Sequence, residues 1–282
     1  MSIRTDLAVE AHELSRGQAD AIDGVKLQKT VHGSISRTVV DITSDNGAET
    51  LGKEKGRYIT IEAPDLKYSL DDYENVCRML ASEIKSMCPQ IDKTLVVGLG
   101  NQDITPDALG SEAISQLIIT SHIKEHMPGT LDDDYSSVCA VAPGVMGTTG
   151  IETVEIIKGI TEKVKPDTII AIDALAGADI KRVCTTIQIA DTGIAPGSGV
   201  GNNREGLNEQ TLGVKVIAIG VPTVIAAELL SDGNLPEEYA TLMVTTKDID
   251  LVIKRMSRTV ANGINMALHK NLSFRDIESI VD

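Results

Sequence analysis

The pattern that decides the fold occurs twice in this 282-residue chain, in Leu95-Val-Val-Gly-Leu-Gly-Asn-Gln-Asp-Ile-Thr-Pro-Asp107 and in Thr168-Ile-Ile-Ala-Ile-Asp173. Each stretch starts with a short apolar run, typical of a buried strand, and ends on an aspartate. In open parallel sheets the strand ends converge on a crevice where ligands bind. We therefore expect both carboxylates at one sheet edge, where a pair can catalyse acid/base hydrolysis.

The segments around these two runs alternate between strand and helix patterns. Further strand candidates lie at 136–141, 183–189 and 214–219, and helical segments lie near 105–126, 151–163 and 223–230. Apolar residues also recur at helical spacing over 71–88 and in a long amphipathic helix that closes the chain. This alternation predicts an α/β fold, a three-layer sandwich with a mainly parallel central sheet.

The N-terminal part of the chain has a different character. Residues 25–63 hold three β-rich stretches, Val25–Val31, Ile35–Ile42 and Arg57–Ile61, separated by the Gly- and charge-rich Ser44–Gly56. They predict a small β-rich addition, made of hairpins or an antiparallel layer. The chain length and a hydrophobic content of 42% are compatible with one large domain that needs no disulfides.

Charge and composition exclude several partners. Lys and Arg number 26 against 41 Asp and Glu, which gives a net charge of -15 that repels phosphate backbones. Aromatic residues make up only 2% of the chain, which disfavours recognition of single strands by stacking. We therefore expect no direct nucleic-acid partner, and a partner that is basic or neutral.

The N-terminal sequence, the short apolar runs and the cysteines indicate a cytoplasmic protein. The N-terminus, Met1-Ser-Ile-Arg-Thr-Asp6, lacks the apolar core of a secretory signal, and no apolar run reaches the length of a membrane span. The four cysteines form no Cys-x-x-Cys pair, which fits buried thiols in a reducing compartment.

Three glycine-containing segments are predicted as loops at the same edge as the aspartates: Ala142-Pro-Gly-Val-Met-Gly-Thr-Thr-Gly150, Gly220-Val-Pro-Thr223, and 191–202. Glycine lets the backbone approach a ligand closely and adopt positive φ. Main-chain groups of these loops are therefore candidates for holding a peptide.

Each aspartate also has a structural interpretation. Thr105-Pro-Asp107 has the residues of a helix start, with a capping Thr, Pro in the first position and an acid favoured by the helix dipole. Asp173 fits a structural role less well, because a carboxylate beside a buried strand is costly unless it is paired or used. If the two carboxyls come within hydrogen-bond reach, they titrate as a coupled pair, one protonated and one ionised.

Other candidate sites are weaker. His122 and His126 have the i, i+4 spacing of metal ligands, but Lys124 and Glu125 beside them indicate a solvated helix end rather than a zinc-protease motif. The glycine pairs around Gly98–Gly100 and Gly197–Gly201 lack the phosphate-loop lysine and the dinucleotide spacing. We expect no metal and no cofactor.

Six long motifs, in order and almost from end to end, resemble the germination protease family of spore-forming bacteria. They are Ser2-Ile-Arg-Thr-Asp-Leu-Ala-Val-Glu-Ala-His12, Gly56-Arg-Tyr-Ile-Thr-Ile-Glu-Ala63, Val96-Val-Gly-Leu-Gly-Asn101, Thr105-Pro-Asp-Ala-Leu-Gly110, Ala142-Pro-Gly-Val-Met-Gly147 and Pro196-Gly-Ser-Gly-Val-Gly-Asn202. The resemblance implies an endopeptidase that degrades small acid-soluble spore proteins when a spore germinates. It also implies an atypical aspartic-type mechanism, whose two acids map onto Asp107 and Asp173.

The resemblance gives the glycine-rich loops a role as well. Residues expected to position the substrate peptide are Gly100, Asn101, Gly144, Met146, Gly147, Gly197, Ser198 and Gly199. Members of the family are made as inactive precursors that cleave off a short N-terminal propeptide, and they assemble as homotetramers. Here the processing site maps onto the bond between Asp6 and Leu7, so residues 1–6 form the propeptide and 7–282 a single peptidase domain in the spore core.

Three alternatives stay open. The core is also similar to that of hydrogenase maturation proteases, which share a Gly-x-Gly-Asn turn followed by an acid and bind a metal through a histidine. No histidine lies in a suitable loop here, which favours a metal-free pair of aspartates. A non-catalytic module that binds spore proteins through its acidic surface is the second alternative, and a nucleotide-binding domain is the third.

Overall fold

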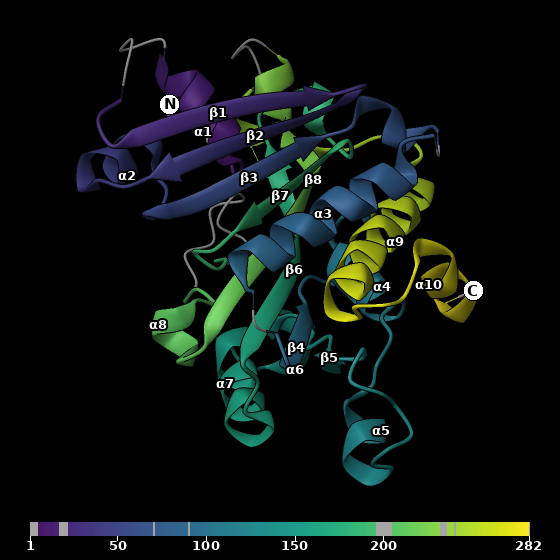
Figure 1. Cartoon of the computed structure of the whole chain (residues 1–282). Helices are drawn as coiled ribbons and strands as arrows, with labels where there is room; N and C mark the ends of the chain where they lie inside the picture. The colour runs from purple at the N-terminus through teal and green to yellow at the C-terminus, as the bar shows by residue number, and fades with distance from the viewer. Residues whose placement is uncertain are drawn as a thin grey trace.

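The structure, a computed structural model, describes residues 5–16, 22–69, 71–89, 91–195, 205–231, 236–239 and 241–281. Within them a single nine-stranded sheet runs in the order β1-β2-β3-β7-β8-β6-β4-β5, and β9 pairs with β8 (Figure 1). The strands are β1 (Val25–His32), β2 (Ile35–Ile42), β3 (Gly56–Glu62), β4 (Lys93–Gly98), β5 (Ser137–Val141), β6 (Thr168–Gly177), β7 (Thr186–Ala190), β8 (Lys215–Ala226) and β9 (Met243–Val244).

The sheet has a parallel and an antiparallel section. Strands β5, β4, β6 and β8 are parallel neighbours, whereas β1, β2, β3 and β7 pair antiparallel and join β8 through β7. The β-rich N-terminal stretch is therefore present as expected, and it continues the main sheet. The aspartates belong to the parallel section, whose strands end at one edge.

Helices cover both faces of the sheet, which confirms the three-layer α/β architecture (Figure 1). One face packs against α3 (Tyr73–Met87), α4 (Leu109–Ile114), α9 (Ile249–Leu268) and α10 (Phe274–Val281). The other face packs against α1 (Ala8–Arg16), α2 (Asp45–Leu51), α7 (Thr153–Val164) and α8 (Glu209–Leu212). Short helices α5 (Ser121–His126) and α6 (Met146–Thr149) lie in connections.

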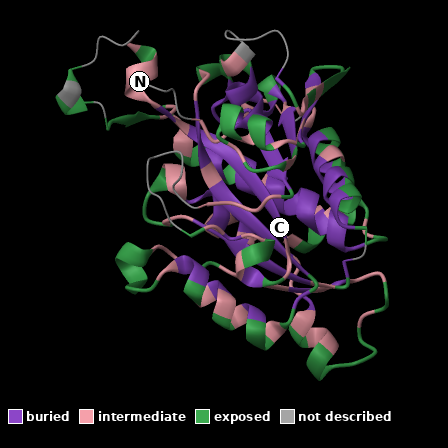
Figure 2. Cartoon of the chain, turned by 90° about the vertical axis from the view of Figure 1, so that its left-hand side faces the viewer, coloured by how far each residue is buried: buried purple, intermediate pink, exposed green. Residues whose placement is uncertain are grey.

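The apolar periodicity of the sequence explains how α3 and α9 pack on the sheet. In α3 the side chains of Val76, Leu80 and Ile84 recur at helical spacing and are fully buried. They pack in one cluster with the same kind of stripe on α9, including Met256 and Val260, and with the isoleucines of the central strands. The strands in the middle of the molecule are buried along most of their length (Figure 2).

Several predicted boundaries are wrong. The strand at 168–172 continues to Gly177, and β8 runs to Ala226 through the predicted loop at 220–223 and into the predicted helix at 223–230. These two extensions pair with each other, so each keeps the other in extended form. The predicted helix at 105–126 is broken into η2 (Thr105–Asp107), α4 and α5, and the helices α1 and α2 were not expected.

The remaining elements are single turns, η1 (Pro64–Lys67), η3 (Ile180–Arg182), η5 (Ala227–Leu230) and η6 (Glu237–Tyr239). No helix among the described residues is both long and apolar enough to cross a membrane.

Candidate active site

Asp173 lies inside β6 rather than just beyond it, opposite Gly220 of β8. Side chains alternate along a strand, so Asp173 shares a face with Ile169, Ala171 and Leu175, the face that carries α1 and α7. Its side chain is only 5% exposed. Its Oδ1 accepts a hydrogen bond of 2.9 Å from the backbone N–H of Ala174.

Burial raises the pKa of Asp173 well above the usual range of an aspartate. The negative charges of Asp107 and Asp6 act in the same direction, while the hydrogen bond from the Ala174 N–H opposes the shift. Three carboxyl groups therefore meet here, two from the predicted pair and one from the N-terminal segment. Burial therefore favours the protonated form of Asp173.

Asp107 is placed by the turn that follows β4. The Leu99 N–H donates to the Ile172 carbonyl of β6 (2.8 Å), and the Asp107 Oδ2 accepts from the Asn101 N–H (2.7 Å). Gly100 has φ of +97°, and a Cβ there would lie 2.0 Å from the Asp107 carbonyl oxygen. Only glycine fits this position, so the Gly100-Asn101 turn and Asp107 form one unit.

The predicted capping role of Thr105 is wrong. Thr105–Asp107 is a 3₁₀ turn without a side-chain cap, and α4 begins only at Leu109. Gly110 in α4 lies against the end of β4 and the middle of β6, since a Cβ there would come within 2.3 Å of the Leu99 carbonyl oxygen and 2.7 Å of that of Ile172. This close approach brings the Asp107 turn next to Asp173 in β6.

The N-terminal segment enters the same site. The Asp6 N–H donates to the Ala176 carbonyl (2.9 Å), and the Ala176 N–H donates to Asp6 Oδ2 (2.8 Å). The Lys53 Nζ donates to the Thr5 carbonyl (2.8 Å). Burial lowers the pKa of Lys53, and the charges of Asp6 and Glu10 oppose that shift. The predicted processing site, Asp6 and Leu7, is thus held beside β6.

Gln188 of β7 contacts the residues on either side of Leu7. Its Nε2 donates to the Asp6 carbonyl (3.0 Å), and its Oε1 accepts from the Ala8 N–H (2.7 Å). Leu7 itself is fully buried and packs with Val9 and Leu175. Asp6, Lys53 and Gln188 all border a cavity of about 210 Å³ that also reaches Gly220, the strand partner of Asp173.

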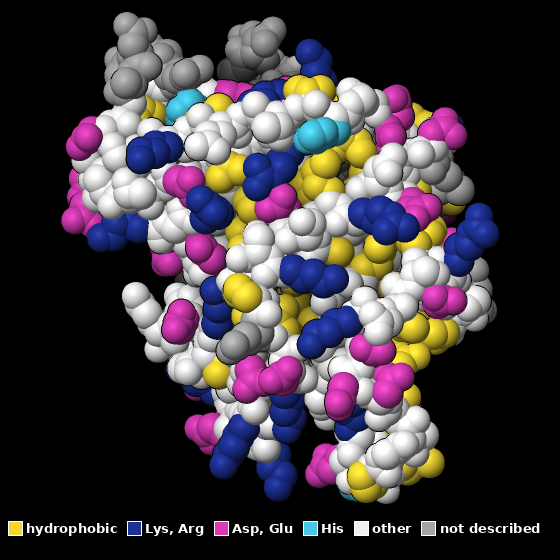
Figure 3. Space-filling view, in the orientation of Figure 1, with side chains coloured by type: hydrophobic (Ala, Val, Ile, Leu, Met, Phe, Trp, Pro, Cys, Tyr) yellow, Lys and Arg dark blue, Asp and Glu magenta, His cyan; other side chains and the backbone are white. Residues whose placement is uncertain are grey.

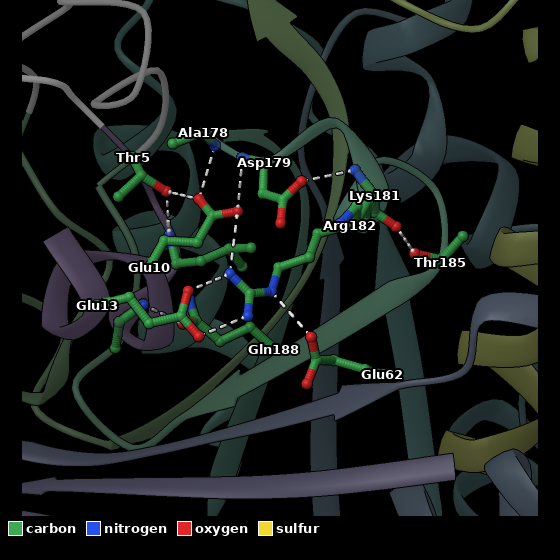
Figure 4. Close-up of polar contacts among 12 residues, drawn as sticks. Thr5, Glu10, Glu13, Glu62, Ala178, Asp179, Lys181, Arg182, Thr185 and Gln188 are labelled. Carbon is green, nitrogen blue, oxygen red and sulfur yellow. Dashed lines mark hydrogen bonds and ion pairs between the residues drawn. The ribbon is translucent and has the colours of Figure 1, made fainter. Parts of the chain in front are cut away.

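Glu10 and Arg182 fix α1 to the turn after β6 (Figure 4). Buried Glu10 accepts from the N–H groups of Ala178 and Asp179 and from the Thr5 hydroxyl. The Arg182 guanidinium makes a paired contact with Glu13 (2.6 and 2.8 Å), one with Glu62 (2.9 Å), and a longer one with Glu10 (3.7 Å).

The other predicted substrate-binding residues are more distant or outside the described part. Gly144, Met146 and Gly147 lie after β5, which is separated from β6 by β4. Met146 is 40% exposed, and the turn is held by its own backbone, with the Thr148 N–H bonded to the Val145 carbonyl. Gly197, Ser198 and Gly199 lie outside the described residues.

Four polar residues of this region were not predicted: Glu10, Lys53, Arg182 and Gln188. Only Gln188 carried a usable signal, since a glutamine between Ile187 and Ile189 places a polar group on one face of an apolar strand. For metals, no group of three or more His, Cys, Asp or Glu is close enough to hold an ion within the described ranges. His122 and His126 are exposed on α5.

Comparison with known proteins connects this geometry to one family. A family model described as germination protease matches residues 4–235. A germination protease of Clostridium perfringens strain SM101 is 41% identical, and the alignment covers 100% of this chain and 99% of the relative. That of Clostridium tetani is 41% identical over 100% of both chains, and that of Bacillus subtilis is 38% identical over 96% and 94%.

A solved structure is also similar, at a greater distance. It is a [NiFe] hydrogenase maturation protease from Thermococcus kodakarensis, 17% identical, with a TM-score of 0.38 over 66% of this chain and 98% of the other.

Proposed function

The chain belongs to the germination protease family, and from this membership we propose that it is the endopeptidase that begins to degrade small acid-soluble spore proteins when a spore germinates. Asp107 and Asp173 carry the hydrolysis. No cofactor takes part. The site of action is the cytoplasm of the spore, its core.

In the proposed mechanism, one proton moves to Asp107 and another leaves Asp173. Partly exposed Asp107 acts as the base and takes a proton from water, whose oxygen attacks the carbonyl carbon of the scissile bond. Asp173 starts protonated and gives its proton to the departing amide nitrogen, so the C–N bond breaks and a carboxylic acid and an amine result. Asp107 ends protonated and Asp173 ionised, and exchange with solvent restores both.

One observation carries this assignment: Asp173 is buried and Asp107 raises its pKa further. Two acids whose environments separate their pKa values supply the acid and the base of such a reaction. The raised value suits Asp173 to the role of acid at neutral pH. Asp107 suits the role of base, because its carboxylate accepts the Asn101 N–H.

The same site is proposed to process the chain itself. The bond between Asp6 and Leu7 lies beside β6, and its residues touch Ala176 and Gln188. Residues 1–6 then form the propeptide of a self-cleaving precursor, and the remaining domain assembles as a homotetramer. The loops at Gly100–Asn101, 144–147 and 197–199 are proposed to position the substrate.

A mapping experiment tests the function. A purified small acid-soluble spore protein is incubated with the full chain, with Asp173→Asn, and with Asp103→Asn as a matched control from the exposed part of the Asp107 turn. Mass spectrometry should find peptides cut after an acidic residue, and loss of residues 1–6, in the wild type and the control only. Intact substrate with all three proteins would contradict the proposal.

Two alternatives give other results. A metal-dependent endopeptidase would lose activity with a chelator and recover it with nickel. An enzyme that uses two aspartates alone would keep its activity in the chelator. A non-catalytic module would bind the spore protein in a salt-sensitive way and release no peptides. Acidic and basic side chains are interspersed on the face in Figure 3, which does not favour an acidic docking patch on that face.

A further inference from the structure

We propose that Gln188 binds the carbonyl group of the peptide bond that is cut, in the N-terminal segment and in substrates alike. The inference rests on the proposed function and adds a group to it. Gln188 would hold the scissile carbonyl oxygen through Nε2 while water attacks, and it would be oriented for this task by α1. The roles proposed for Asp107 and Asp173 do not include a hydrogen-bond donor to this oxygen.

The sheet places Gln188 next to the aspartate. Asp173 of β6 pairs with Gly220 of β8, and Gly220 pairs with Gln188 of β7, so the three residues form one row across neighbouring strands. Residues opposite each other in a sheet point to the same face. The middle position of the row has no side chain of its own, and the Leu175 side chain packs against it. The row therefore carries a carboxyl at one end and an amide at the other.

The partners fix which way the amide points. The Ala8 N–H can only donate and the Asp6 carbonyl can only accept, so the former must face Oε1 and the latter Nε2. The Nε2 lies 3.0 Å from the Asp6 oxygen, within the range for a donor that stabilises a developing oxyanion. That oxygen belongs to the peptide bond between Asp6 and Leu7. Negative charge would develop on this oxygen when water attacks the bond.

Processing would remove only one of these two partners. Ala8 belongs to α1 and stays, so its N–H continues to orient the amide. Asp6 leaves, and the Nε2 donor then faces the cavity that it borders with Lys53 and Gly220. Gln188 is only 7% exposed, and a buried donor without a partner is costly. The carbonyl of an incoming substrate satisfies it.

The Ala176 backbone supports the same interpretation. Its carbonyl accepts from the Asp6 main-chain N–H, and its N–H donates to the Asp6 side-chain carboxylate, so β6 holds Asp6 through both its backbone and its acidic side chain. β4 pairs with β6 only as far as Ile172, which leaves this part of β6 without β4 as a neighbour. Departure of Asp6 frees these groups too, so the Ala176 carbonyl can accept from the main-chain N–H of the residue before the cut and the Ala176 N–H can donate to its side chain where that residue is acidic.

The first test measures the contact in the full chain without requiring cleavage. The sequence has three Asp–Leu bonds, at Asp6, Asp65 and Asp250, so labelling Asp carbonyls with ¹³C and Leu amides with ¹⁵N gives three correlated NMR signals. In Asp173→Asn, which keeps the chain intact, adding Gln188→Met should shift the Asp6 carbonyl signal and leave the other two in place. An unmoved Asp6 signal would overturn the proposed contact.

The second test measures the effect on the reaction. Gln188→Met should lower kcat on a spore-protein peptide by about 10²–10³-fold, as removal of an oxyanion donor does, with KM changed far less. Gln188→Glu keeps an oxygen that accepts from the Ala8 N–H but lacks the Nε2 donor, so its kcat should fall by a similar factor. This variant tests the proposal if Gln188→Met does not fold. Gln116→Met, at another amide that joins two elements, should keep kcat.

The outcomes distinguish a failure of the proposed function from a failure of the role proposed for Gln188. An inactive wild type would contradict the proposed function, and the carbonyl signal would still decide whether Gln188 binds Asp6. An active, folded Gln188→Met or Gln188→Glu protein with unchanged kcat would show that the amide only fastens α1 and would overturn this inference alone. Self-cleavage at Asp6, which has no KM, should slow by the same factor as kcat.

Discussion

The carboxyl group of Asp173 destabilises the folded protein whenever it is ionised, because it lies in the sheet interior beside two other acids. A raised folded-state pKa means that its contribution to stability is complete below the unfolded pKa and is lost as the pH rises through the folded value. The protein keeps a residue that lowers its stability at neutral pH, which is typical of a group retained for chemistry.

The variant Asp173→Asn removes this cost. We expect its melting temperature to exceed that of the wild type at neutral and alkaline pH, by about 2–4 °C for each kcal/mol gained, and to converge with it near pH 4. Circular dichroism melts from pH 4 to 8 measure the difference, with Asp103→Asn as the exposed control. A variant less stable than the wild type at pH 8 would show that the carboxylate is stabilised, not strained.

Single residues also show what the sequence could and could not predict. Asp107 and Asp173 were proposed as site residues from the residues around them, because a strand pattern next to an acid is a local signal. Gln188, Lys53 and Arg182 act on residues far away in the chain, as in the contact of Gln188 with Ala8. Such contacts depend on which strands become neighbours, and no local pattern contains that.

At the level of elements, the outcome differs from strand to strand. The starts of β6 and β8 were found to within one residue but their ends were missed, whereas the predicted strand at 183–189 starts three residues before β7. Small residues such as Ala174 and Gly177 indicate a loop when considered alone. They stay extended because β8 pairs with them to Ile225, and this pairing moves Asp173 from the strand end into the strand.

The join between α1 and β6 depends on Arg182, whose guanidinium contacts Glu10, Glu13 and Glu62. Arg182→Met would leave Glu10, which is 2% exposed, without its ion-pair partner, and Glu62 with only its longer contact to Lys29 (3.6 Å). Removing one partner of a buried pair typically costs about 3–5 kcal/mol, so we expect the free energy of unfolding to fall by that order.

Urea unfolding checks this, with Arg78→Met as the control. Arg78 pairs with Glu74 four residues earlier on the exposed side of α3, and such pairs contribute about 0.3–0.5 kcal/mol. Equal losses in the two variants would contradict the assignment of the Arg182 cluster as the anchor of α1.

On the scale of the whole molecule, the fold brings four distant parts of the chain to one place. The turn after β4 carries Asp107, β6 carries Asp173, and β7 carries Gln188, while the N-terminal segment lies beside them with the bond at Asp6. This convergence requires the mixed sheet, because β7 joins the parallel section only through its antiparallel pairing with β8.

The central claim is that the two aspartates together hydrolyse the peptide bond. Its most direct test is the rate at which a purified small acid-soluble spore protein is cleaved by the wild type, Asp107→Asn, Asp173→Asn and the control Asp103→Asn, with folding verified by thermal melts. Losing an acid or a base should slow cleavage by about 10²–10⁴-fold in both site variants and leave the control unchanged. A folded Asp107→Asn or Asp173→Asn protein that cleaves at nearly the wild-type rate would contradict the account.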